Sequence, residues 1–111
     1  MLRNQFFIES GDAQLFRSVL NEVLNGFMVD DFNAAIGLER SELERLLKYL
    51  SRLPDDSEVE LTLVEMRAFH NALRETLDEL GIEEFHTRTG FEFEEGERVF
   101  KKLDYLLNES K

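Results

Sequence analysis

The chain has 111 residues, a net charge of −11 and no cysteine. Its length suits one domain with a single core, and a hydrophobic content of 42%, with ten phenylalanines, argues against a disordered chain. Without cysteine the chain has no disulfide, thiolate metal site or cysteine nucleophile. No apolar run approaches the length of a bilayer, so we expect no membrane span and a location in the cytoplasm.

The negative charge is concentrated in the second half of the chain. Residues 1–53 contain six Lys or Arg and eight Asp or Glu, whereas residues 54–111 contain seven and sixteen, so the halves carry −2 and −9. This charge opposes approach to nucleic-acid phosphates and to anionic membranes. It is compatible either with an acidic surface that only keeps the protein soluble or with an acidic face that binds a partner.

The first elements along the chain are a short strand and a core helix. Residues 4–9 are apolar and aromatic and end at a Ser-Gly-Asp turn, which predicts a strand. Residues 13–27 predict a helix that Ser10 or Asp12 caps, because a short oxygen-bearing side chain can accept from the unpaired amides of the first turn. The apolar positions of this helix recur at helical spacing and are Leu15, Phe16, Val19, Leu20, Val23, Leu24 and Phe27.

Two further helices are predicted around a glycine turn. Residues 29–38 contain a short helix that ends at Gly37, because glycine takes a positive φ without a Cβ clash. The helix that follows carries Leu43, Leu46, Leu47, Leu50 and Leu53. Counted with Gly37 as the ninth position, the segment resembles a helix-turn-helix motif. The apolar positions of that motif fall on Phe32, Ile36, Leu38, Leu43 and Leu46, while Asn33 stands where the motif usually has alanine.

A polar break with the only proline follows, and we place a linker there, at residues 54–57. Residues 58–61 alternate between acidic and apolar, as an edge strand does. Thr62 and Glu65 fit a capping box at the start of a helix that ends at Gly81. The expected core of this helix is Met66, Phe69, Leu73, Leu77 and Leu80.

The remaining residues repeat the short helix and turn over 82–91 and end in a helix from residue 94 or 95 to about 107. The repetition extends further back along the chain. Residues 15–53 laid on residues 68–106 without a gap give thirteen identities, against roughly three or four expected by chance for segments so rich in Leu and Glu. A duplication with an offset of 53 positions is therefore favoured.

These elements predict a mainly α protein in which residues 1–111 form a single domain. The domain consists of two tandem repeats of strand, helix, short helix and helix, at about 5–53 and 58–106. The repeats face each other across an approximate two-fold axis, because one copy alone cannot bury its apolar stripes. We expect the two strands to pair as an antiparallel ribbon, whose exposed edges favour a homodimer.

Residues able to carry catalysis are few. His70 neighbours Arg74 and Glu75 on a helix, and we expect a solvated helix face there. His86 lies among charged residues on the short helix, where we expect a surface histidine rather than a metal ligand. No metalloprotease, nucleophile-elbow, phosphate-loop or calcium-loop motif occurs, so we predict no catalytic, metal or cofactor site.

DNA binding is the alternative that the helix-turn-helix resemblance raises. The residues that would contact DNA are Arg40, Arg45, Lys48 and Arg52, which lie along one side of the predicted helix. Three acidic residues, Glu39, Glu42 and Glu44, crowd the beginning of that helix and would repel phosphates. Nucleic acid is therefore not the expected partner.

The leading hypothesis is a non-enzymatic module that regulates or binds another protein, one that carries basic charge, in the way of an immunity protein or an inhibitor. The expected contact residues are Asp78, Glu79, Glu83, Glu84, Glu92, Glu94, Glu95 and Glu97. A DNA-binding regulator is the alternative, and a metal-assisted enzyme is the third reading.

Overall fold

The computed structural model describes residues 5–109 of the chain. Within this range the protein is mainly helical, with one two-stranded antiparallel sheet, as the sequence predicts at this level. The elements in chain order are β1 (Gln5–Ile8), α1 (Ser10–Asn21), the π-helical turn η1 (Glu22–Gly26), α2 (Phe32–Ile36), α3 (Arg40–Ser51), β2 (Val59–Thr62), α4 (Leu63–Thr89) and α5 (Phe93–Glu109). No helix of the described range is both long enough and apolar enough to cross a bilayer.

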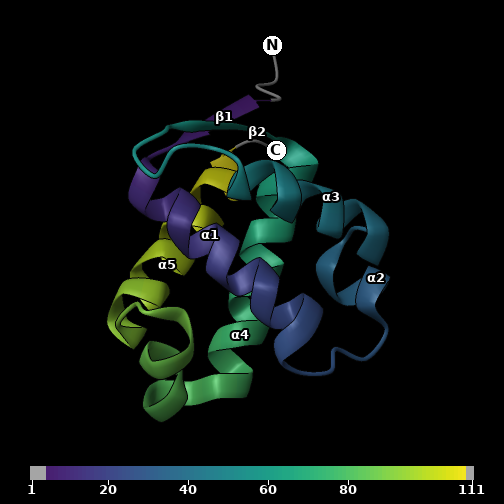
Figure 1. Ribbon diagram of the computed structural model, residues 1–111, viewed down its shortest axis with the longest axis vertical. Coiled ribbons are helices and arrows are strands. Elements are labelled where there is room, and N and C mark those ends of the chain that lie inside the picture. The colour runs from purple at the N-terminus through teal and green to yellow at the C-terminus, as the bar shows by residue number, and fades with distance from the viewer. Residues whose placement is uncertain (1–4, 110–111) are drawn as a thin grey trace.

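Helices α1 and α4 cross at the centre of the molecule (Figure 1). Helix α3, with the short α2 before it, packs beside α1 on one side, and α5 packs along α4 on the other. The ribbon of β1 and β2 covers one end of this helical layer. The chain therefore places its two strands, which are far apart in sequence, directly beside each other.

The ribbon buries one face and exposes the other. Phe6 pairs with Leu61 and Ile8 with Val59, and all four side chains are buried. Phe7 lies opposite Glu60 on the exposed face. Since side chains alternate along a strand, this register confirms the alternation predicted for residues 58–61. The first residue of the strand predicted over 4–9 lies outside the described residues.

The core is centred on a pair of phenylalanines between α1 and α4. Phe16 and Phe69 are fully buried, and their rings stack with centroids 4.3 Å apart and 17° between the ring planes. Burying each phenylalanine contributes about 1.5–3 kcal/mol. Of the apolar positions predicted for the first helix, all are buried except Phe27, which is half-buried. In α4 the predicted core residues are buried except Leu77, which is half-buried.

The start and the end of the first helix differ from the prediction. Helix α1 begins at Ser10 rather than at residue 13, and neither Ser10 nor Asp12 caps it, because the capping position is Glu9 and its side chain makes no capping bond. Asp12 instead contacts Lys102 of α5. After Asn21 the helix widens into η1 and then ends, since Phe27 has an extended backbone. Neither the contact of Asp12 with Lys102 nor the widened turn η1 could be predicted from the local sequence pattern.

The capping box predicted at the start of the fourth helix is confirmed. The Thr62 hydroxyl accepts from the Glu65 amide at 3.1 Å, and the Glu65 carboxylate accepts from the Thr62 amide at 2.8 Å. Gly81 has non-helical angles, φ 64° and ψ −174°, and breaks α4 where the sequence predicts a helix end. The residues after this break form the predicted short helix.

The predicted turn at Gly37 is also confirmed. Gly37 has φ 96° and ends α2 with a hydrogen bond from its amide to the Asn33 carbonyl at 2.7 Å. Among the apolar positions shared with helix-turn-helix motifs, Ile36, Leu43 and Leu46 are buried, and Phe32 and Leu38 are half-buried. The amide side chain of Asn33 donates to Glu39 at 2.7 Å, so a polar contact replaces the apolar one expected of the motif.

Candidate interaction surfaces

The acidic residues predicted as a contact surface are all exposed. They lie on the second half of α4, on the turn after it and on α5. Within the described part of the chain, Glu92 alone among them has a basic side chain within 4 Å, that of His86, whose Nε2 lies 3.6 Å from the Glu92 carboxylate. The seven other carboxylates have no cation within 4 Å in that part, so their negative charge is not neutralised internally.

These acidic side chains line more than one groove. Asp78 and Glu97 line the same groove between α4 and α5, together with Arg74 and Lys101. Glu95 lines a different groove, which α5 forms with the beginning of α1. The structure therefore brings Asp78 and Glu97 together and separates Glu95 from them.

The residues predicted for DNA contact are all exposed, but their surroundings differ. The Arg40 guanidinium donates to the Leu24 carbonyl at 2.7 Å and lies 4.6 Å from the centroid of the Phe32 ring. Arg40 is thus held by the protein itself. Arg45 lines a groove that also contains carboxylates, and its side chain is exposed, as are those of Lys48 and Arg52.

The two histidines have different surroundings. The prediction of a solvated His70 is wrong, because its side chain is only 14% exposed and stacks on Phe100 with ring centroids 4.5 Å apart. Its ring nitrogens lie 3.1 Å from Asn71 Oδ1 and 3.2 Å from Asp104 Oδ1. His86, at 60% exposure, is the predicted surface residue. Among residues 5–109 no group of three or more His, Asp or Glu side chains is arranged to hold a metal ion.

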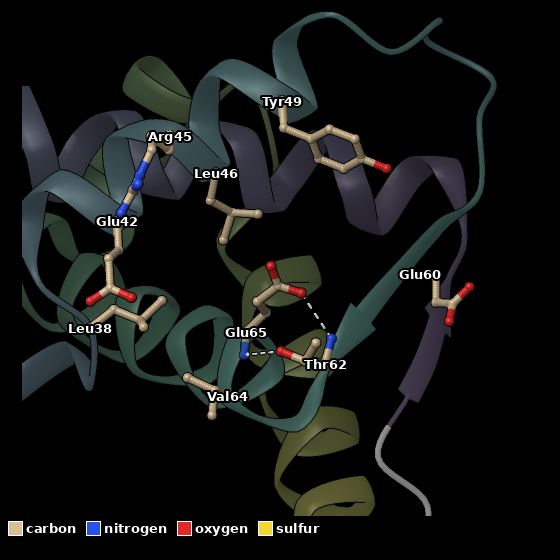
Figure 2. A pocket seen from close by; sticks show the side chains of 9 residues that line it. All are labelled: Leu38, Glu42, Arg45, Leu46, Tyr49, Glu60, Thr62, Val64 and Glu65. Atoms are coloured by element: carbon tan, nitrogen blue, oxygen red, sulfur yellow. Dashed lines mark hydrogen bonds between the residues drawn. The ribbon is translucent and has the colours of Figure 1, made fainter.

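A groove lies between α3 on one side and β2 with the first turn of α4 on the other, and we call it the α3–β2 groove. Its volume is about 550 Å³. Figure 2 shows Leu46 and Tyr49 projecting from α3, with Glu65 facing them from the first turn of α4. Val64 lies at the lower edge and Glu60 comes from β2. The groove thus joins two elements that the linker separates along the chain.

The charge of the α3–β2 groove is unbalanced. Three carboxylates, Glu42, Glu60 and Glu65, line it together with one cation, Arg45. Across the described residues no ion pair within 4 Å involves any of these four side chains. One Glu65 oxygen accepts from the Thr62 amide, which holds this carboxylate in place. The groove is therefore an acidic site whose negative charge no ion pair neutralises, and its Glu65 carboxylate is held in place.

The same groove exposes apolar surface. Tyr49 is 51% exposed and Val64 is 50% exposed, although large apolar side chains are normally buried. Sequence reasoning did not find this site. Its available signals were that Tyr49 lies off the leucine stripe of its helix and that Glu60 is on the outward face of an alternating strand. Neither signal shows that α3 and β2 lie side by side.

An ion pair between a buried carboxylate and a partly exposed guanidinium links η1 to α4. The Glu22 carboxylate, with a side chain 7% exposed, lies 2.8 Å from the Arg88 guanidinium. Arg88 also donates to the Gly26 carbonyl at 3.1 Å. A Cβ atom at Gly26 would lie only 2.7 Å from Arg88, so the absence of a side chain there leaves room for the pair. This contact is structural, and the sequence analysis did not predict it.

No protein family, curated protein or solved structure matches this chain.

Proposed function

We propose that the protein is a non-enzymatic binding protein of the cytoplasm whose acidic second half contacts a basic partner protein, as an immunity protein or an inhibitor does. The observation that carries the proposal is the exposed, internally unneutralised charge of seven carboxylates, four on α4 and three on α5. Such charge accelerates encounter with a basic surface and disfavours acidic competitors.

The strength of this attraction follows from the exposure of the groups. Each exposed ion pair contributes about 0.2–1 kcal/mol, and salt screens it over about 8–10 Å. At about 0.35 kcal/mol each, near the low end of this range as salt screening implies, four such pairs would change the affinity about tenfold. Their contribution should fall steeply between low and physiological salt.

A defined cationic probe tests the proposal. Fluorescence anisotropy with labelled octalysine measures the affinity of the full chain and of two variants with equal net charge. The test variant carries Asp78→Asn, Glu83→Gln, Glu94→Gln and Glu97→Gln. The control variant carries Asp30→Asn, Asp31→Asn, Glu44→Gln and Asp56→Asn, all at exposed positions outside the proposed surface. We expect about a tenfold loss of affinity in the test variant and less than a threefold loss in the control.

Equal losses in the two variants would show that only net charge matters, and the acidic surface would then be a solubilising one. Labelled duplex DNA in the same assay tests the alternative ligand. We expect no binding of the duplex at physiological salt, because the chain carries a net charge of −11. Tight duplex binding that Arg45→Glu abolishes would favour DNA binding over binding of a basic protein as the function.

We also propose that the chain arose by internal duplication. The first residues of two pairs of helices support this, because each pair differs by 53 positions. Helices α1 and α4 begin at Ser10 and Leu63, and α3 and α5 begin at Arg40 and Phe93. Gly37 and Gly90, also 53 positions apart, each end a helix with a positive φ, of 96° and 83°. Both glycines occupy a conformation that residues with a Cβ rarely adopt.

The contacts between the halves support an approximate two-fold axis. On such an axis a residue meets its own counterpart. Phe16 stacks on Phe69, and Phe7 pairs with Glu60, and both pairs are 53 positions apart. Phe7 is also 66% exposed on the ribbon, and this apolar residue supports the proposed homodimer. Sedimentation equilibrium that gives a monomer mass at high concentration would exclude that dimer.

A further inference from the structure

The α3–β2 groove has a counterpart on the other side of the molecule. This second groove, which we call the α5–α1 groove, lies between α5 and the beginning of α1 and has a volume of about 190 Å³. Nine residues line each groove, and eight of the nine in one lie 53 positions from eight of the nine in the other. The corresponding charged residues are Glu42 and Glu95, Arg45 and Arg98, and Glu65 and Asp12.

One difference between the grooves concerns a cation. Lys102 of the α5–α1 groove corresponds to Tyr49 of the α3–β2 groove. The Lys102 ammonium lies 2.5 Å from the carboxylate of Asp12, whose side chain is 13% exposed. Glu65, the counterpart of Asp12, has no cation within 4 Å among the described residues. The chain therefore supplies an ammonium to one groove and none to the other.

The overall charge of the two grooves differs accordingly. Each groove contains three carboxylates, but the α5–α1 groove has two cations and the α3–β2 groove has only Arg45. The α3–β2 groove is also the larger, at about 550 Å³ against about 190 Å³. It has both the charge deficit and the space for one more basic side chain.

We propose that the α3–β2 groove binds a lysine or arginine side chain from an extended segment of a partner protein. The cationic head lies against the Glu65 carboxylate, as Lys102 lies against Asp12 in the related groove. This inference rests on the basic partner of the proposed function, but it places an anchoring contact in the first groove rather than on the acidic surface of α4 and α5.

The walls of the groove suit the rest of such a side chain. The half-exposed Tyr49 and Val64 offer apolar surface to the aliphatic stem, and the Tyr49 ring face attracts a cation. The hydrogen bond from the Thr62 amide, at 2.8 Å, fixes the Glu65 carboxylate before the partner arrives. Because the acceptor is already ordered, binding loses less conformational entropy.

The test compares two acetylated and amidated tripeptides, Leu-Lys-Leu and Leu-Gln-Leu, titrated into the isotope-labelled full chain. Backbone amide chemical shifts measure both the affinity and the place of binding. We expect the lysine peptide to shift the amides of Tyr49, Val64 and Glu65, and the glutamine peptide to leave them unchanged. Glu65→Gln should weaken binding about fivefold, since glutamine keeps the capping bond to Thr62 but removes the charge.

Substitutions at the site where the grooves differ make the test specific. Tyr49→Lys supplies an internal cation, as Lys102 does in the related groove, and should weaken peptide binding at least tenfold. Tyr49→Phe keeps the ring and should bind within twofold of the wild type. Lys102→Tyr removes the internal cation of the α5–α1 groove. In this variant the lysine peptide should shift the amides of Gly11 and Asp12, which it leaves unchanged in the wild type.

The inference would be overturned if Tyr49→Lys bound the lysine peptide with unchanged affinity, or if this peptide shifted only amides of α5. The variant with four neutralised acids on α4 and α5 separates this result from the proposed function. If that variant keeps tripeptide binding while losing octalysine affinity, both proposals stand. If the wild-type chain binds octalysine but not the lysine tripeptide, only the groove inference is refuted. If it binds the tripeptide, but the two charge variants lose equal octalysine affinity, only the acidic-surface proposal is refuted.

Discussion

The ion pair of the buried Glu22 and the partly exposed Arg88 gives a quantitative test of how η1 is held. Arg88→Met keeps an unbranched side chain but removes the guanidinium, so the Glu22 carboxylate stays buried without its cation. Removing one partner of a buried ion pair costs about 3–5 kcal/mol. Because the Arg88 side chain is 36% exposed, water reaches the site, and we reduce the expected loss to about 2 kcal/mol.

Urea unfolding followed by circular dichroism at 222 nm measures this loss. In thermal unfolding of a domain of this size, a loss of about 2 kcal/mol in the free energy of unfolding lowers the melting temperature by about 8 °C. The double variant Glu22→Gln with Arg88→Met should lose less than Arg88→Met alone, since no charge then remains buried. A loss below about 0.5 kcal/mol in Arg88→Met, or strict additivity in the double variant, would refute the reasoning.

Two further predictions concern packing and capping, and thermal unfolding measures both. Gly96→Ala should lose about 1–3 kcal/mol, because its Cβ would lie 2.8 Å from the ring of the buried Phe85. The control, Gly11→Ala, adds a methyl group to open space in α1 and should raise the free energy of unfolding by about 0.5–1 kcal/mol. Equal effects of the two substitutions would contradict the packing argument. Thr62→Ala should cost about 1 kcal/mol through loss of the cap of α4, whereas Thr62→Ser should retain most of that stability.

Most helices could be predicted because burial repeats with the helical period. The stripe of Leu15, Phe16, Val19 and Leu20 is buried as its spacing indicates, and so is the pair Met66 and Phe69. The capping box at Thr62 was predictable for a different reason, since both of its hydrogen bonds join residues three positions apart.

Features that depend on distant neighbours were not predictable. His70 lies one helical turn from Arg74 and Glu75, which indicated a solvated face, yet Phe100 and Asp104 of α5 cover it in the fold. Asp12 has the chemistry of a helix cap but contacts Lys102 instead. In each case the side chain meets a partner that local pattern cannot identify, because the packing of α5 determines it.

The sequence by itself determined the helical periods, the glycine turns, the alternating strands and the uneven charge of this protein, since each depends on residues close together in the chain. Only the tertiary structure decided that Tyr49 and Glu65 face each other across a groove and that Glu22 is buried against Arg88. The groove arises where α3 lies beside β2 and the first turn of α4, and the ion pair arises where η1 packs on α4. They exist because helices pack to exclude water over their whole apolar faces, and this brings polar residues together regardless of their distance in sequence.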